Sequence, residues 1–184
     1  MRRLRKVTTF ESLSIRDYRL LWLSQLTTAM GQFMDMTSRS WLIYQLTGSP
    51  LHLGMVNTAR GLPMLLFGVV AGVAADRYGR KAQLVIAQVV NSLLNLILAT
   101  LILTGRIQEW HVYVTAFLAG TVQAFQQPAR QVLINDLVGQ EHLLNAISLS
   151  SAAMNISRSV GPALCGILIA AFGVDISYYV QAGF

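Results

Sequence analysis

The stretch GVAADRYGRK, residues 72–81, is a short charged turn between two long apolar segments. The flanking residues 62–75 and 82–103 carry no charged side chain. Two apolar helices joined by so short and so charged a loop cross a membrane and return the chain to the same aqueous face. An ordinary basic loop is the alternative interpretation, and it gives these ten positions no special role.

The composition is typical of a membrane protein. Hydrophobic residues make up 54% of the 184 residues and charged residues only 12%, and the mean hydropathy is +0.51. A soluble domain has roughly a quarter charged residues. The net charge of +6 does not indicate a nucleic-acid partner, because the basic residues gather beside apolar segments, as in loops that contact lipid headgroups. The single cysteine, Cys165, excludes an intramolecular disulfide.

The apolar segments predict an all-α, polytopic transmembrane helix bundle. Each is near or above the roughly 20 residues that cross about 30 Å of hydrocarbon, although the last one stops at residue 184. Stop signals separate them at residues 47–50 and 104–105, at Pro128 and at Gly173. We expect a basic N-terminal segment over 1–19 and a bundle over 20–184, with helices at 20–46, 54–75, 82–103, 111–127, 143–172 and 176–184.

Charge asymmetry predicts the orientation. Six basic residues precede the first span and three follow the second, whereas Arg106 is the only one between spans three and four. The positive-inside rule then places the N-terminus and the 72–81 turn in the cytoplasm of a multi-pass protein of the plasma membrane. A signal peptide is disfavoured, because the first apolar stretch begins late and contains Asp35 and Arg39.

Polar residues follow one face of the first span, spaced three or four apart: Gln25, Thr28, Gln32, Asp35 and Arg39. We interpret this face as the wall of a hydrated cavity, to which Gln123 of span four also contributes. The alternative is a helix–helix contact. That alternative is favoured for the polar and small residues of spans three and five.

Charges inside the spans predict a second feature. At about 1.5 Å per residue, Asp35, Arg60 and Arg158 lie roughly 21 to 24 Å above the cytoplasmic edge and share one layer. Asp35 is either neutralised by Arg60 or Arg39 as a structural ion pair, or it gains and loses a proton during transport. Because the arginines outnumber Asp35, we expect a substrate with negative charge or several oxygen acceptors.

The spacing Gly-x-x-x-Asp-Arg-x-Gly-Arg-Lys resembles the signature loop of the major facilitator superfamily. Further segments resemble its siderophore and macrolide exporters: residues 41–50, 125–129, 136–138, 145–146, 155 and 161–162. The resemblance implies two six-helix bundles around a cavity with alternating access, usually with proton antiport. It also implies a cytoplasmic latch that closes on a C-terminal bundle, formed by Gly72, Asp76, Arg77, Gly79, Arg80 and Lys81 with Asp136 as a partner of Arg80. Close helix packing is expected at Gly68, Gly72, Gly120, Gly161, Pro162 and Gly166, and a left-handed turn is expected at Gly79.

Some positions depart from the exporter pattern. Ala116 stands where an arginine is frequent in span four, and Ser157 and Cys165 stand where glycines are usual in span five. No phosphate-binding loop, metal-ligand spacing or nucleophile–base pair is visible, so we predict no cofactor, no metal and no enzyme activity. The chain is expected to be the N-terminal half of a transporter, cut inside its sixth span. The alternative is a half-length membrane protein without transport activity of its own, acting as a scaffold or through a partner chain.

Overall fold

The computed structural model describes residues 11–77 and 79–183, which form helices joined by short turns. In chain order these are η1 (Glu11–Ser14), α1 (Arg16–Thr47), α2 (Pro50–Arg77), α3 (Arg80–Leu103), α4 (Glu109–Phe172) and α5 (Val174–Ala182). The predicted all-α fold is confirmed. The basic residues at positions 2–6 lie outside the described part of the chain.

Glycine and proline set several of the helix boundaries. Gly48 ends α1 with a left-handed φ of 64°, and its N–H donates to the carbonyl of Tyr44 at 2.8 Å. Pro50 then begins α2 at the position where a missing N–H costs nothing. This is earlier than the sequence predicted, because the proline serves as the first helical residue rather than as part of the loop.

The fourth and fifth predicted spans are two arms of one interrupted helix. Pro128, expected to stop the fourth span, lies inside α4, so this expectation was wrong. The break falls at Gly139, where φ is 66° and ψ is 175°, a conformation open mainly to glycine. We call residues 109–138 the first arm of α4 and residues 140–172 the second arm.

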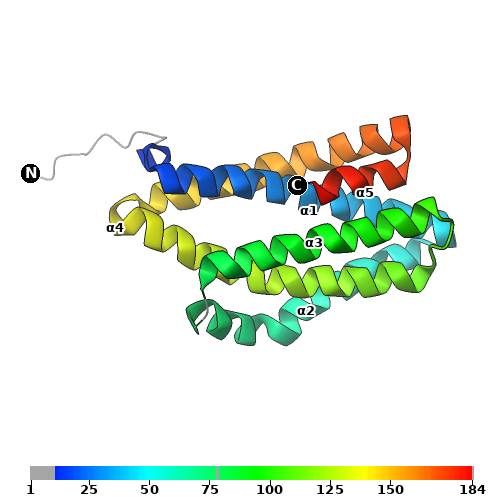
Figure 1. Ribbon diagram of the computed structural model, residues 1–184, viewed down its shortest axis with the longest axis horizontal. Helices are drawn as coiled ribbons and strands as arrows, with labels where there is room; N and C mark the ends of the chain where they lie inside the picture. The colour runs from blue at the N-terminus through cyan, green and yellow to red at the C-terminus, as the bar shows by residue number, and fades with distance from the viewer. Residues whose placement is uncertain (1–10, 78, 184) are drawn as a thin grey trace, which may run out of the picture.

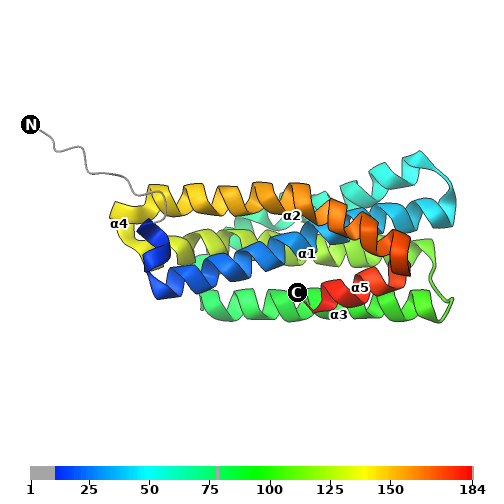
Figure 2. The same ribbon diagram turned by 90° about the horizontal axis from the view of Figure 1, so that it is seen from above.

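The helices run along one common long axis (Figure 1). At one end of the bundle lie η1, the turn between α2 and α3 and the kink at Gly139, and we call this the loop end. The turns that join α1 to α2, α3 to α4 and α4 to α5 lie at the opposite end. Figure 1 shows α1 between the two arms of α4, and the view from above shows α5 ending halfway along the bundle (Figure 2).

Two apolar clusters hold the bundle at its two ends. At the loop end, Tyr18 packs with Ile134, Val138 and residues of the second α4 arm, and its hydroxyl donates to the carbonyl of Ala146 at 2.9 Å. At the opposite end, residues of α1 to α5 pack together: Leu42, Ile43, Val56, Leu98, Ala99, Val112, Ala116 and Tyr178. The middle of the bundle, between the clusters, contains the buried polar residues.

The outer surface of the bundle is largely apolar, whereas charged and polar side chains are buried between its two apolar clusters. Leu65 and Val69 of α2 are each 84% exposed, whereas Arg39 is 1% exposed. That distribution costs free energy in water but suits a lipid environment, where apolar side chains face the acyl chains. Among the described residues, three stretches are long and apolar enough to span a membrane, Pro50–Ala75, Arg80–Leu103 and His142–Phe172. The predicted transmembrane character is confirmed.

Candidate functional site

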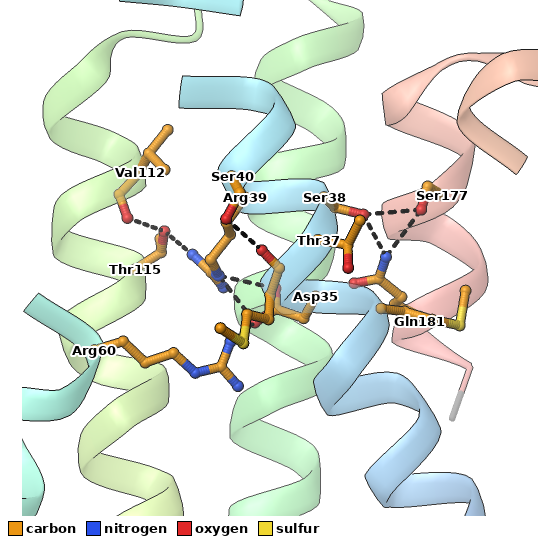
Figure 3. Close-up of polar contacts among 12 residues, drawn as sticks. Asp35, Thr37, Ser38, Arg39, Ser40, Arg60, Val112, Thr115, Ser177 and Gln181 are labelled. Atoms are coloured by element: carbon orange, nitrogen blue, oxygen red, sulfur yellow. Dashed lines mark hydrogen bonds and ion pairs between the residues drawn. The ribbon is translucent and has the colours of Figure 1, made fainter. Parts of the chain in front are cut away.

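Asp35 of α1 is the centre of the site (Figure 3). Arg39, one turn further along α1, donates from Nε to both carboxylate oxygens, at 2.8 Å to Oδ1 and 2.9 Å to Oδ2. Arg60 of α2 donates from Nη1 to Oδ2 at 2.7 Å. Hydrogen bonds between two charged groups are roughly twice as strong as neutral ones. One carboxylate therefore connects α1 to α2.

Thr115 connects the same cluster to the first arm of α4. Arg39 Nη1 donates to the Thr115 hydroxyl at 2.6 Å, and that hydroxyl donates to the carbonyl of His111 at 2.7 Å. The hydroxyl thus serves as acceptor and donor at once. Three helices are joined by this one chain of hydrogen bonds, which Figure 3 shows from Asp35 to Val112.

The side chains of the cluster are almost completely buried. The side chains of Arg39, Asp35 and Arg60 are 2%, 7% and 14% exposed. A charge at the centre of a bilayer costs about 2.5 to 3.5 kcal/mol on insertion scales, so such residues persist only when they are paired. Two guanidinium groups and one carboxylate leave a formal charge of +1. The site is therefore a paired but electropositive point in the middle of the bundle.

A small polar cavity adjoins the carboxylate. Its volume is about 30 Å³, and Asp35 and Arg60 line it together with Thr28, Gly31, Gln32, Gln88, Asn91, Asn95, Ala119, Gln123 and Gln181. A water needs about 10 to 15 Å³ of such volume and two to four polar partners, so the cavity has room for about two waters. Thr28, Gln32 and Asp35 of the first-span face line this cavity, whereas Gln25 and Arg39 do not.

A second set of polar side chains lies beside the cluster, between α1, the second α4 arm and α5. Gln181 Nε2 donates to the hydroxyls of Ser38 at 2.8 Å and Ser177 at 2.9 Å. Ser38 also lies 3.0 Å from the sulfur of Cys165. The Gln181 Oε1 atom is buried without a hydrogen-bond partner among the described residues, and Gln181 lines the small cavity. A cavity water would satisfy this oxygen.

Gly120 allows α2 to approach the first arm of α4. A Cβ atom at this position would lie 2.0 Å from the carbonyl oxygen of Arg60 and 2.9 Å from its carbonyl carbon. No real Cβ contact is this short, so only glycine fits without moving the backbone that carries Arg60. Gly161 is similar, since its Cβ would meet Phe33 at 2.9 Å.

Replacing Gly120 with Ala is expected to lower the free energy of unfolding by about 1 to 3 kcal/mol, the usual cost of overpacking. The reason is that α2 must move away from α4, which also draws Arg60 from Asp35. Thermal unfolding of the detergent-purified full-length protein measures the effect. Gly68→Ala in the same α2 is the control, because a Cβ there has no atom within 4 Å. Equal melting temperatures for both variants would contradict the close approach.

The turn residues lie together at the loop end. Arg80 Nη1 of α3 donates to Asp136 Oδ2 in the first α4 arm, and the two side chains are 33% and 42% exposed. Gln83 Nε2 reaches back to the carbonyl of Ala74 at 2.7 Å. Arg77 and Lys81 are exposed, and the side chain of Asp76 lies outside what the structure describes.

Gly79 corrects one expectation. Its φ is −58°, so the turn does not need the left-handed conformation that the sequence suggested for it. Close packing is also not found at Gly68, Gly72 or Gly166, where no described atom lies within 4 Å of a Cβ. Pro162 is half-buried within α4.

The remaining glutamines of the first-span face contact other helices, Gln25 as a buried side chain and Gln32 as a half-buried one. Gln25 Nε2 donates to the carbonyl of Ser150 at 3.3 Å, and Gln32 Nε2 donates to Gln126 Oε1 at 2.9 Å. Arg158 is not brought into the cluster. It is exposed on the second α4 arm, and within the described residues it has no ion pair. The ion-pair cluster therefore contains Asp35, Arg39 and Arg60 and does not include Arg158.

Sequence reasoning missed Thr115, Gln181 and Arg130. Thr115 and Gln181 are single polar residues in apolar segments, and nothing in their spacing marks them. The sequence predicts a helix end at Pro128 and so places Arg130 outside a span. In the structure Arg130 lies within α4 and lines a cavity. The available signal was that Arg130, a polar residue two positions after Pro128, continues the helical pattern.

A helical bundle with an apolar outer surface and a buried, paired acid beside a polar cavity defines a polytopic membrane protein of the transporter class. Comparison with protein families is specific: residues 7–183 match the family described as transmembrane secretion effector. The chain belongs to this family of the major facilitator superfamily, as its sequence motifs predicted.

Three curated relatives agree with this assignment. An uncharacterized MFS-type transporter, YfiS, of Bacillus subtilis is 30% identical over 162 residues, covering 87% of this chain and 37% of the relative. The staphyloferrin A transporter of Staphylococcus aureus is 30% identical, covering 83% and 39%. The multidrug efflux pump Tap of Mycolicibacterium fortuitum is 31% identical, covering 89% and 41%. The chain thus spans about two fifths of the length of these relatives.

Proposed function

We propose that the full-length protein is a secondary active transporter that exports small molecules in exchange for protons, by alternating access, and that this chain forms its N-terminal bundle. The observation that carries the proposal is Asp35, a buried carboxylate that connects α1 and α2 beside a polar cavity. A relative named as a multidrug efflux pump supports the export direction. The proposal takes no resident cofactor or metal.

Hydrogen-bond accounting suggests how a proton would act. The carboxylate of Asp35 accepts from two N–H groups: Arg39 Nε–H, which is shared between Oδ1 and Oδ2, and Arg60 Nη1–H, which donates to Oδ2. A proton on Oδ2 would turn this acceptor into a donor that faces the Arg60 donor. Arg60 would then leave, and since it belongs to α2, the tie between α1 and α2 would open. Protonation is thus linked to a separation of helices, which a transport cycle requires.

The charge of the cluster supports a substrate class. With a formal charge of +1, the site favours substrates that carry negative charge or several oxygen acceptors, which Arg60 would bind when it leaves Asp35. Arg158 was expected to share this role. We assign the role to Arg60 alone, because Arg158 is exposed on the far arm of α4.

The loop end is proposed to face the cytoplasm. Arg77, Arg80 and Lys81 lie there, whereas Arg106 lies at the opposite end. The turn and its Arg80–Asp136 ion pair would form a latch that closes on a C-terminal bundle in the cytoplasmic membrane. Because both side chains are partly exposed, they remain able to exchange partners between states.

Replacing Arg80 with Asp is expected to slow transport severalfold while changing the free energy of unfolding by about 1 kcal/mol or less, since partly exposed ion pairs contribute little to stability. The initial rate of substrate efflux and thermal unfolding measure the two effects. Combining Arg80→Asp with Asp136→Arg restores the pair in the opposite direction, and we expect it to recover part of the rate. A double variant no faster than the single one would contradict the role of this pair.

The proposed function is tested in inverted membrane vesicles that contain the full-length protein. Respiration acidifies the vesicle lumen, and a pH-sensitive acridine dye reports it. Adding a panel of polycarboxylates and macrolides is expected to release protons for at least one compound, because each transported molecule exchanges for a proton. Vesicles without the protein are the control. Accumulation of a compound that is unaffected by a protonophore would refute proton coupling.

A further inference from the structure

A second cavity lies nearer the loop end than the Asp35 cluster. Its volume is about 380 Å³, and its walls come from α1 and from both arms of α4, which the kink at Gly139 folds back on each other. The size is that of a small-molecule site, which usually measures about 300 to 1,000 Å³. The lining residues are Gln25, Gln127, Arg130, Gln131, Ile134, Leu143, Ile147, Ser150, Ser151 and Met154.

Arg130 is the only charged side chain in that lining. It is half-buried, and its Nε atom is fully buried without a hydrogen-bond partner. Within the described part of the chain, no carboxylate pairs with it. A buried N–H donor without a partner is costly, because it has lost its hydrogen bond to water and gained none in the protein. This arginine is therefore in place for an acceptor that the bundle itself does not supply.

The other lining residues indicate the chemical character of the ligand that would supply this acceptor. Amide and hydroxyl groups of Gln127, Gln131 and Ser151 add further polar contacts near Arg130. Ile134, Leu143, Ile147 and Met154 form an apolar part of the wall. An arginine fork binds the two oxygens of a carboxylate or phosphate side by side. The matching ligand has one anionic head group and an apolar body.

The position of the cavity connects it to the Asp35 cluster. Gln127 lines the larger cavity and Gln123, one helical turn away, lines the smaller one. Between them the Gln32–Gln126 hydrogen bond joins α1 to α4 at 2.9 Å. The two cavities therefore lie next to each other along the face between these helices.

We propose that Arg130 binds the anionic head group of an amphipathic organic acid, a carboxylate or phosphate monoester, in the cavity between α1 and the two arms of α4. The proposal deepens the proposed transport function. It rests on that function where it treats the cavity as a site of substrate entry. Binding itself needs neither proton coupling nor a transport cycle. The head group belongs either to a dissolved organic acid or to an anionic lipid, which carries the same phosphate chemistry.

Binding of radiolabelled octanoate to the full-length protein in nanodiscs of phosphatidylcholine tests the proposal. We expect saturable binding that Arg130→Gln weakens at least tenfold, because the charge-assisted fork is lost. Arg130→Lys, which keeps the charge without the fork, should fall between the two. Uncharged octanamide should not compete. Arg106→Gln removes an exposed cation at the opposite end and is the matched control.

Two further results decide the outcome. If nanodiscs containing phosphatidylglycerol abolish octanoate binding to the unmodified protein, and the lipid is retained by that protein but not by Arg130→Gln, the occupant is a lipid head group. If octanoate still binds there, the occupant is a dissolved acid. Equal affinity of the unmodified protein and Arg130→Gln, with unchanged melting temperatures, would overturn the site. That result would leave the proton-release experiment unaffected, so the two proposals fail separately.

Discussion

Replacing Asp35 with Asn in the full-length protein is expected to reduce proton-driven accumulation of substrate to the background of empty vesicles. Asparagine keeps the shape of the side chain but cannot exchange a proton with the lumen. Exchange of labelled for unlabelled substrate needs no net proton movement, so we expect it to continue at a measurable rate. Loss of accumulation with retained exchange distinguishes a proton carrier from a structural ion pair, the two roles that the sequence leaves open for Asp35.

Vesicles with a defined pH gradient provide both measurements on one preparation. Asp17→Asn is the matched control, because Asp17 belongs to the same helix but is exposed at its start. It should leave accumulation and exchange unchanged. If Asp35→Asn accumulates substrate as the unmodified protein does, the coupling proposal is wrong and Asp35 is structural. Loss of both activities together with a lower melting temperature would also assign Asp35 a structural role.

Replacing Arg39 with Gln is expected to have the largest effect on stability, a loss of about 3 to 5 kcal/mol, typical of removing one partner from a buried ion pair. Arg39 is 1% exposed and supplies two bonds to Asp35 and one to Thr115. Its loss leaves the carboxylate with Arg60 alone. Denaturant titration of the purified full-length protein, followed by intrinsic fluorescence, measures the change.

A double-mutant cycle separates this pair from general damage. Combining Arg39→Gln with Asp35→Asn removes the unpaired charge, so the double variant should be more stable than Arg39→Gln alone. Arg39→Lys keeps the charge but loses the fork, and we expect an intermediate value. Additive losses in the double variant would show that Asp35 and Arg39 are not energetically coupled.

The sequence predicted the paired charges only in part. Asp35 and Arg39 are one turn apart, so their contact follows from helix geometry. The depth estimate also placed Arg60 in the same layer as Asp35, where the structure has the two 2.7 Å apart. The same estimate failed for Arg158, because depth along a helix says nothing about the direction in which a side chain faces. Direction depends on the rotation of each helix, which packing against its neighbours determines.

The helix ends were also predicted only in part. Gly48 and Gly173 end helices where the sequence suggested, because the conformational freedom of glycine is a local property. Pro128 did not, since a proline inside a membrane helix is tolerated when other groups satisfy the freed carbonyl. The break moved to Gly139, where the two arms of α4 turn back on each other.

The sequence by itself determined that this is a helical membrane protein with a charged turn and an acid inside its first span, because hydropathy, charge asymmetry and glycine or proline chemistry act locally along the chain. Only the tertiary structure decided which charges are paired, that Arg130 has no carboxylate partner among the described residues, and which glycines are needed for close contact. Those features depend on distances between helices far apart in sequence, such as the approach of Gly120 to the backbone of Arg60. No periodicity within a single helix contains such a distance.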